Sequence, residues 1–262
     1  MIRTLLSIFF FLSVSSLSAT FIGNPAQPGL LEKSIIRKKP SWWSFRAGYL
    51  DDWIYKQRFQ DEFKLQGVTH TRTFMKLSTY AALLTLNLKD RIDFYGIVGS
   101  SRMQIDQEIF TKRALSWGVG GKLILFKHGN FFLGADAKYF ETNQKPRYFV
   151  VDGLAYNIES NYRLKYHAMQ GALGISYRAW IFAPYINCTY ILTHIEPEPA
   201  VLYVRLPDVY DLVDVESKSV VGQKKWGLAL GLTLVDALKA SLSVEWRAIN
   251  QNAVDVNFSI RF

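Results

Sequence analysis

Apolar and polar residues alternate along residues 253–262, AVDVNFSIRF, where the sequence ends on an aromatic residue. A period of two places successive side chains on opposite faces of a β-strand. The same alternation runs through two preceding segments, KWGLALGLTL at 225–234 and LKASLSVEWR at 238–247. Each segment has about the length that a tilted strand needs to cross a bilayer. The C-terminal region therefore predicts three consecutive membrane-crossing strands, each with one apolar and one polar face.

These strands are typical of an outer-membrane barrel rather than of a soluble antiparallel sheet, because the alternation continues to a terminal aromatic residue. We predict an all-β, antiparallel transmembrane β-barrel of ten strands, with twelve or more as the alternative. The last strand pairs with the first, so that no strand edge is left in lipid. The predicted strands are 43–56, 71–89, 91–104, 113–127, 130–141, 162–177, 181–195, 223–234, 238–249 and 253–262.

The connections between these strands predict the orientation of the barrel. Tight turns alternate with longer segments, which are 57–70, 105–112, 142–161 and 196–222. Outer-membrane barrels have short periplasmic turns and long extracellular loops. The alternation is imperfect near His167–Gln170 and in the second strand, where we expect a β-bulge or an error in the strand boundary.

The N-terminal segment MIRTLLSIFFFLSVSSLSA has a basic residue, an apolar run and then small residues, which is the layout of a cleaved secretory signal peptide. A membrane-spanning helix is the alternative, but serines interrupt the run before about 20 apolar residues have passed. We therefore expect a signal peptide at 1–19, a periplasmic N-terminal segment at 20–42 and the barrel at 43–262. The basic stretch LEKSIIRKKPSWW either contacts anionic headgroups or is a solvated leader.

The composition fits an exported membrane protein. Cys188 is the single cysteine, which excludes an intramolecular disulfide, and we expect it to face lipid. The formal net charge of +9 suits nucleic acid or anionic lipid, and the membrane topology excludes nucleic acid as a partner. The sequence has no Cys/His cluster and no glycine-rich phosphate loop, so we expect no metal and no cofactor.

Aromatic residues gather at the predicted strand ends, as the two interfacial girdles of a barrel require. The predicted periplasmic girdle contains Trp42, Trp43, Phe126, Phe131, Phe132, Trp180, Phe182 and Phe262. The predicted extracellular girdle contains Trp53, Tyr55, Tyr139, Phe140, Tyr162, Tyr190 and Trp246.

Several stretches together resemble the chlamydial major outer membrane protein family. They are GNPAQPGLL near the start, SFRAGYLDDWIYKQRF, DRIDFYGIVGSS, ALGISYRAWIFAPYI, and the close WGLALGLTLVDALKASLSVEWRAINQNAVDVNFSIRF. The resemblance implies a pore-forming surface antigen in the outer membrane, possible adhesion to a host-cell receptor, and a homotrimer. This chain departs from the family in having one cysteine and in being shorter, which implies fewer strands.

The polar parity of the strands predicts which side chains line the lumen. The predicted pore-lining residues are Arg46, Asp52, Arg91, Asp93, Lys122, Asp136, Lys138, Lys225, Lys239, Glu245, Arg247, Asp255 and Arg261. Positive side chains exceed negative ones by three in this set, which predicts a mild preference for anions. Inward glycines leave space in the lumen and favour a narrow pore; they are Gly48, Gly118, Gly120, Gly134, Gly227 and Gly231.

The alternating tail also predicts an assembly signal. We expect Phe258, Ile260 and Phe262 to be recognised by the barrel-assembly machinery of the outer membrane.

Two functions remain open at this point. The first is a porin through which small solutes and ions diffuse, and the second is a closed barrel that binds partners through its long extracellular loops. Ten strands lie between the filled lumen of about eight strands and the aqueous channel of about sixteen. An outer-membrane protease is a third possibility; its candidates are His70, His167, His194, Asp208, Asp211 and Asp214. These residues have no spacing that fixes a base beside a water, so we expect no enzyme.

Overall fold

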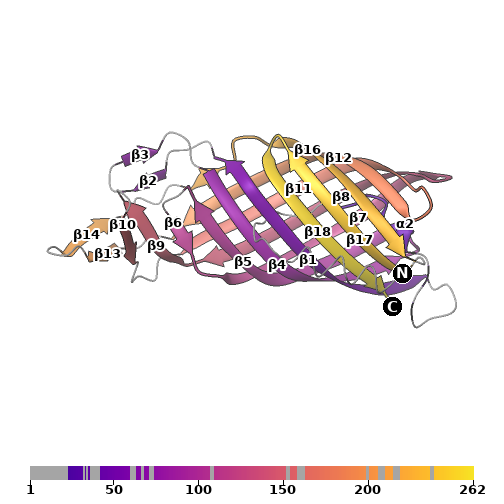
Figure 1. Ribbon diagram of the computed structural model, residues 1–262, viewed down its shortest axis with the longest axis horizontal. Coiled ribbons are helices and arrows are strands. Elements are labelled where there is room, and N and C mark those ends of the chain that lie inside the picture. The colour runs from indigo at the N-terminus through magenta and orange to yellow at the C-terminus, as the bar shows by residue number, and fades with distance from the viewer. Residues whose placement is uncertain are drawn as a thin grey trace.

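The computed structural model is a closed antiparallel β-barrel (Figure 1). It describes residues 23–31, 33, 35, 42–59, 63–65, 68–70, 74–106, 109–151, 154–157, 163–198, 201–205, 210–214, 219–236 and 239–262. The predicted signal peptide at 1–19 lies outside the described residues. The strands of the ring are β1 (Trp43–Arg58), β4 (Phe74–Leu88), β5 (Ile92–Ile105), β7 (Ala114–His128), β8 (Phe131–Gln144), β11 (Leu164–Tyr177), β12 (Phe182–Pro197), β16 (Trp226–Asp236), β17 (Ala240–Ala248) and β18 (Gln251–Arg261).

The ring closes through β1 and β18. Their antiparallel ladder runs from the pair Arg46 and Arg261 to the pair Gln57 and Gln251. Every other ring strand pairs with the ring strand that precedes it in the chain and with the one that follows it. Each ring strand is therefore paired with a neighbour on both sides, as a sheet in lipid requires, with one irregularity in the β1–β4 ladder between Phe45 and Arg58. The prediction of a ten-stranded antiparallel barrel is confirmed.

Additional short strands lie in the long connections. They are β2 (Phe63–Leu65), β3 (Val68–His70), β6 (Ile109–Thr111), β9 (Pro146–Val151), β10 (Leu154–Asn157), β13 (Val201–Arg205), β14 (Tyr210–Asp214) and β15 (Val220–Val221). The hairpins that β2 forms with β3, β9 with β10, and β13 with β14 gather at the end of the barrel opposite the C-terminus (Figure 1). The β9–β10 hairpin joins the barrel sheet through β6, whereas β2–β3 and β13–β14 form separate two-stranded sheets, and none of them widens the ring. The length of their connections identifies this end as extracellular.

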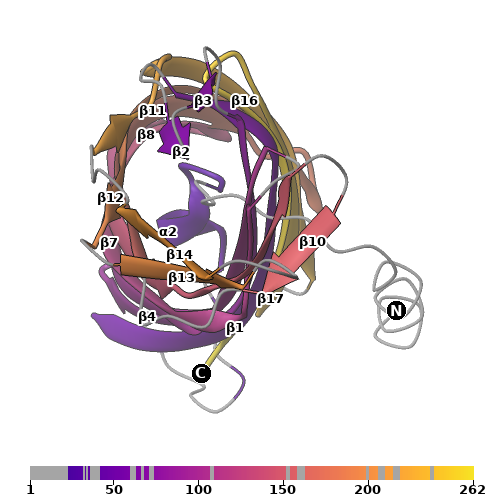
Figure 2. The same ribbon diagram turned by 90° about the vertical axis from the view of Figure 1, so that its left-hand side faces the viewer.

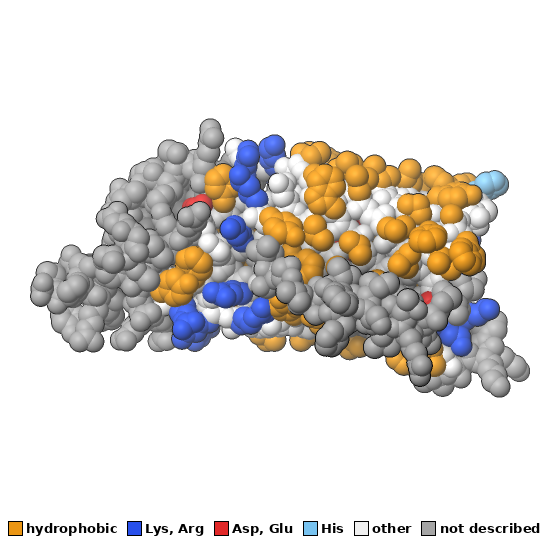
Figure 3. All heavy atoms as spheres, in the orientation of Figure 1, with side chains coloured by type: hydrophobic (Ala, Val, Ile, Leu, Met, Phe, Trp, Pro, Cys, Tyr) orange, Lys and Arg blue, Asp and Glu red, His pale blue; other side chains and the backbone are white. Residues whose placement is uncertain are grey.

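The outer surface of the barrel carries an apolar belt. Large apolar side chains such as Leu84, Val98 and Leu115 are exposed there, and Figure 3 shows hydrophobic side chains gathered on the barrel wall toward the end away from the hairpins. Their neighbours along each strand point inward, as Leu230 and Ala229 illustrate with exposures of 41% and 0%. The period of two in the sequence therefore reports lipid contact on one face and burial on the other.

The predicted bulge near His167–Gln170 is wrong, because β11 keeps an unbroken register with both of its neighbours. The second strand, β4, pairs with β5 without a break, but its ladder with β1 is irregular between Phe45 and Arg58, and β4 begins at Phe74, three residues later than predicted. Their sequence alternation fails for another reason: apolar side chains also point inward there. Tyr166 and Ala168 on β11, like Met75 and Leu77 on β4, belong to an apolar cluster inside the barrel.

The same inward packing removes two residues from the predicted girdles. Phe132 and Phe140 are 1% and 2% exposed and point into the barrel, whereas Phe131 and Trp180 are exposed on the outer surface. Tyr162 lies outside the described residues. Cys188 is exposed on the outer face of β12, as expected for a lipid-facing position.

One short helix, α2 (Gln27–Leu30), lies inside the ring of strands (Figure 2). No helix among the described residues is long and apolar enough to span a membrane.

Leu230 gives a direct test of the register of β16. Leu230→Arg places a charge on the lipid face, so we expect the free energy of unfolding in bilayers to fall by roughly 2–4 kcal/mol. Leu230→Ala is the matched control, because it removes the same side chain without adding a charge. An arginine that costs no more than the alanine would place residue 230 in the interior and shift the register of β16 by one residue.

Candidate functional site: the barrel interior

Most of the predicted lumen residues point into the barrel and are buried there. Each of these ten side chains is 7% exposed or less: Arg46, Asp52, Asp93, Lys122, Asp136, Lys138, Glu245, Arg247, Asp255 and Arg261. They come from β1, β5, β7, β8, β17 and β18. The alternation of the sequence therefore located the polar interior correctly within the strands.

Three predicted residues lie elsewhere, and the prediction is wrong for them. Arg91 is exposed in the turn between β4 and β5, Lys225 is exposed just before β16, and Lys239 is half-buried in the turn between β16 and β17. The period of two was extended past the ends of the strands, where the chain has already left the barrel wall. These three are also the whole positive excess, so the ten buried side chains comprise equal numbers of positive and negative groups.

Arg247 is the centre of the largest charge cluster. Its guanidinium lies 2.5 Å from the carboxylate of Asp52, 3.4 Å from Glu245 and 3.5 Å from Asp255. The register of β17, β18 and β1 creates this cluster, because Asp255 is directly opposite both Glu245 and Asp52. Three carboxylates in one row would repel one another, so the arginine among them is required for stability.

A second ion pair spans β7 and β8. Lys122 and Asp136 are cross-strand partners, with Nζ 3.1 Å from the carboxylate. The hydroxyl of Tyr95 on β5 donates a hydrogen bond of 2.8 Å to the same carboxylate. Tyr95 thereby connects β5 to this pair across the interior.

Residues 23–31, hereafter the N-terminal segment, fill the periplasmic end of the interior. All nine are buried, and the sequence alone predicted only a periplasmic N-terminal segment at 20–42. The side chain of Asn24 donates to the backbone oxygen of Ala183 on β12 (3.1 Å) and to Thr233 on β16 (3.0 Å). The amide of Gln27 donates to Ser241 on β17 (3.0 Å) and Ser259 on β18 (3.2 Å). The segment therefore bonds to strands on several sides of the ring.

Basic and amide side chains of the wall bind the backbone of the N-terminal segment in return. Arg46 donates to the oxygen of Gln27 (2.8 Å), and its other terminal nitrogen pairs with Asp93. Asn87 donates to the oxygen of Pro28 (3.0 Å). Arg261 donates to the oxygen of Leu31. These donors satisfy carbonyl groups that would otherwise be buried without partners.

Apolar contacts complete the attachment of the N-terminal segment. Ala26, Leu30 and Leu31 form one buried cluster with Ile124, Phe132, Ala183 and Val235 of the wall. Phe132 points inward for this reason rather than outward into the girdle. No periodic pattern marks the segment in the sequence, which is why its position was missed.

The glycines that were expected to leave space are covered by neighbouring groups. A Cβ atom at Gly120 or Gly231 would overlap the ring of Tyr95 or Tyr185, respectively, and one at Gly134 would overlap the backbone of Pro25. At Gly227 it would meet the side chain of Asn250, and at Gly48 and Gly118 the backbone of the adjacent strand. The prediction that they open a pore is wrong, since glycine here allows a close approach.

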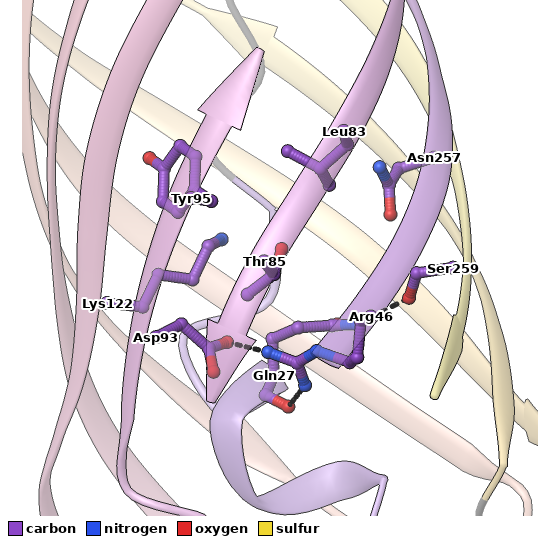
Figure 4. A pocket seen from close by; sticks show the side chains of 9 residues that line it. All are labelled: Gln27, Arg46, Leu83, Thr85, Asp93, Tyr95, Lys122, Asn257 and Ser259. Atoms are coloured by element: carbon purple, nitrogen blue, oxygen red, sulfur yellow. Dashed lines mark hydrogen bonds and ion pairs between the residues drawn. The ribbon is translucent and has the colours of Figure 1, made fainter. Parts of the chain in front are cut away.

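The extracellular part of the interior is filled by apolar side chains. This apolar cluster contains Ile54, Phe59, Met75, Leu77, Met103, Ile105, Ile109, Phe140, Leu164, Tyr166, Ala168, Ile191, Ile195, Val220 and Ala253. Between it and the N-terminal segment lies a small cavity that Arg46, Asp93, Tyr95 and Lys122 help to line (Figure 4). Its volume of about 20 Å³ holds roughly one water molecule.

The candidate protease residues do not assemble in the part that the structure describes. His167 and His194 face outward from β11 and β12 with their rings stacked 5.0 Å apart, and His167 lies 4.0 Å from Glu196. His70 is in β3 and Asp211 and Asp214 are in β14, in strands whose side chains are not described, and Asp208 lies outside the described residues.

The closed ring, apolar belt and polar interior define an outer-membrane β-barrel protein. The sequence is similar to the major outer membrane porins of Chlamydia, which confirms the resemblance. It is 23% identical to the serovar B porin of Chlamydia trachomatis over 379 aligned residues, covering 95% of this chain and 96% of that protein. It is 24% identical to the porin of Chlamydia abortus (strain DSM 27085 / S26/3) over 374 residues, with the same coverage. Both alignments exceed the length of this chain, so these relatives carry additional residues.

Solved outer-membrane barrels are similar at lower levels. The translocator domain of the autotransporter NalP from Neisseria meningitidis has a TM-score of 0.46 and 9% identity, covering 87% of this chain and 91% of that chain. The β domain of the Bordetella autotransporter BrkA has a TM-score of 0.44 and 12% identity, covering 85% and 99%. No protein-family model matches the sequence.

Arg247 tests the balance of the buried charges. Arg247→Met leaves three adjacent carboxylates without their shared cation, so we expect the free energy of unfolding to fall by about 3–5 kcal/mol. Lys225→Met is the control, because this exposed lysine should contribute less than about 0.5 kcal/mol. Urea unfolding in detergent micelles measures both, and equal effects would show that the buried cluster has no special role.

Proposed function

We propose that this protein is a porin-related outer-membrane protein whose barrel is closed at rest, and which acts at the bacterial surface through its extracellular hairpins. The observation that carries the proposal is the burial of the described inward-pointing side chains at every level of the interior, with a cavity of about 20 Å³ between the fillings. The N-terminal segment fills the periplasmic end, paired charges fill the middle and the apolar cluster fills the extracellular end. A host-cell receptor or envelope component is the class of partner that such surface hairpins would contact.

Diffusion of small solutes is the second candidate function, because the relatives bear the name of porins. Passage would require the N-terminal segment to leave and the apolar cluster to separate, since the two fillings lie at opposite ends. Equal numbers of buried positive and negative groups give no basis for strong ion selectivity. The anion preference expected from the sequence loses its support with Arg91, Lys225 and Lys239 outside the interior.

Conductance of the refolded protein in a planar bilayer separates the two functions. We expect no steady open channel in KCl for the full chain. Deleting residues 23–31 should still give no porin-sized conductance, because the apolar cluster remains in place. Heat-modifiability on gels serves as the control for correct folding of both proteins. A steady channel from the full chain would contradict the closed barrel and favour the diffusion porin.

Assembly offers a separate test at the last strand. We propose that Phe258 and Ile260, which lie on the outer face of β18, and Phe262, which directly follows the strand, are recognised during insertion. Deleting Phe262 should lower the amount of heat-modifiable barrel in the outer membrane, while Phe262→Tyr, which keeps an aromatic end, should not. Unchanged yield from the deletion would remove this role.

A further inference from the structure

Basic side chains cluster on the outer wall of the barrel at its extracellular end. Six exposed ones come from β1, β4, β5 and the two residues before β7, and they are Lys56, Arg58, Lys76, Arg102, Lys112 and Arg113. Figure 3 shows Lys and Arg side chains between the hydrophobic belt and the end of the barrel that bears the hairpins. The charge of the wall differs on the other side of the ring at this level. There, on β8, β11 and β12, lysine and histidine side chains lie beside Glu141 and Glu196, so positive charge does not accumulate.

The register of the strands brings the centre of this basic patch together. Arg102 on β5 is directly opposite Ser78 on β4, and one row nearer the membrane centre Ser100 is opposite both Tyr80 and Leu115. Arg113 precedes β7 by one residue and so projects beside Arg102. A pocket of about 170 Å³ opens here, and its lining includes Lys76, Ser78, Arg102, Gln104, Phe110 and Arg113.

Aromatic rings hold two of the cations in place. The guanidinium of Arg113 lies 4.4 Å from the centre of the Tyr80 ring, and the ammonium of Lys56 lies 4.2 Å from the centre of the Phe74 ring. Stacking of this kind orients a cation while leaving its hydrogen-bond donors free for another group. The described acids on these strands near the patch are Asp51 and Asp106, and Asp106 accepts a hydrogen bond from the backbone of Phe74 (2.7 Å). The patch therefore keeps a positive excess.

We propose that this basic patch binds the phosphate group of an anionic lipid headgroup in the outer leaflet. Arginine forks match phosphate oxygens in bidentate geometry, and the pocket has room for a phosphate with several waters. The exposed side chains of Leu84, Val98 and Leu115 continue from the patch toward the centre of the membrane. They provide an apolar surface for the acyl chains of the same lipid. This continuity favours a lipid over a soluble anion. The proposal rests on the location of the barrel in the outer membrane and not on whether the barrel conducts ions.

Native mass spectrometry of the refolded protein in a maltoside detergent tests the site. The probes are a diphosphorylated acylated glycolipid and the same lipid without its phosphates. Arg102→Gln combined with Arg113→Gln should weaken binding of the phosphorylated lipid by about tenfold or more, because it removes the charge-assisted hydrogen bonds of both guanidinium groups to the phosphate. The matched control is Lys224→Gln combined with Lys225→Gln. These lysines precede β16, at the same end of the barrel as the patch but on the opposite side of the ring, so the control removes the same charge and should change binding by less than about twofold.

A third variant, Arg102→Lys combined with Arg113→Lys, separates charge from geometry. It keeps both charges but loses the guanidinium forks, so its affinity should lie between those of the wild type and the glutamine variant. All variants should remain heat-modifiable, since the substituted side chains are exposed. The phosphate-free lipid should bind every variant equally weakly. Equal losses in the two glutamine variants, or equal binding of both lipids by the wild type, would overturn the proposal.

Discussion

The pairing of β1 with β18 is the constraint on which the rest of the structure depends. Lipid offers no hydrogen bonds to a strand edge, so the sheet must close, and here it closes after ten strands. The number of strands sets the diameter of a barrel, and ten strands leave an interior that side chains and a short segment of chain can fill. The space inside the barrel is thus set by where the ring closes, and the hairpins in the long connections do not widen the ring.

A filled polar interior in a membrane must also be electrically balanced. Burying an isolated charge is costly, and a buried ion pair is tolerated when both partners are present and hydrogen-bonded. The equal numbers of acidic and basic groups inside the barrel satisfy this condition. Cross-strand register supplies the pairs directly, as for Lys122 and Asp136, or assembles a cluster, as around Arg247. Two other buried basic residues, Arg46 and Arg261, donate hydrogen bonds to the N-terminal segment. The charge balance of the interior is therefore connected to the attachment of this segment at the periplasmic end.

The sequence was sufficient to predict the ten strands, because contact with lipid enforces a period of two on the outer face. It also located the buried charges within strands, from Arg46 on β1 to Arg261 on β18. Prediction failed for Arg91, Lys225 and Lys239, because the end of a strand leaves no mark in the alternation. Prediction also failed at the inward-facing Tyr166 and Met75, because the sequence pattern does not distinguish apolar side chains that face the interior from those that face lipid. Tyr95 over Gly120 and Gln27 beside Ser259 are contacts between distant residues, which periodicity cannot show.

The central claim is that the N-terminal segment is part of the barrel interior, and hydrogen exchange of its backbone amides measures this most directly. Within it, the N–H of Gly23 donates to Glu245 (3.0 Å) and the N–H of Gly29 donates to the oxygen of Ala26 (2.9 Å). Amides held in this way exchange only when the segment leaves the barrel or the barrel unfolds. We expect a peptide covering 23–31 to exchange as slowly as peptides from the ring strands. Exchange at the rate of an unstructured chain, in a barrel that remains folded, would contradict it.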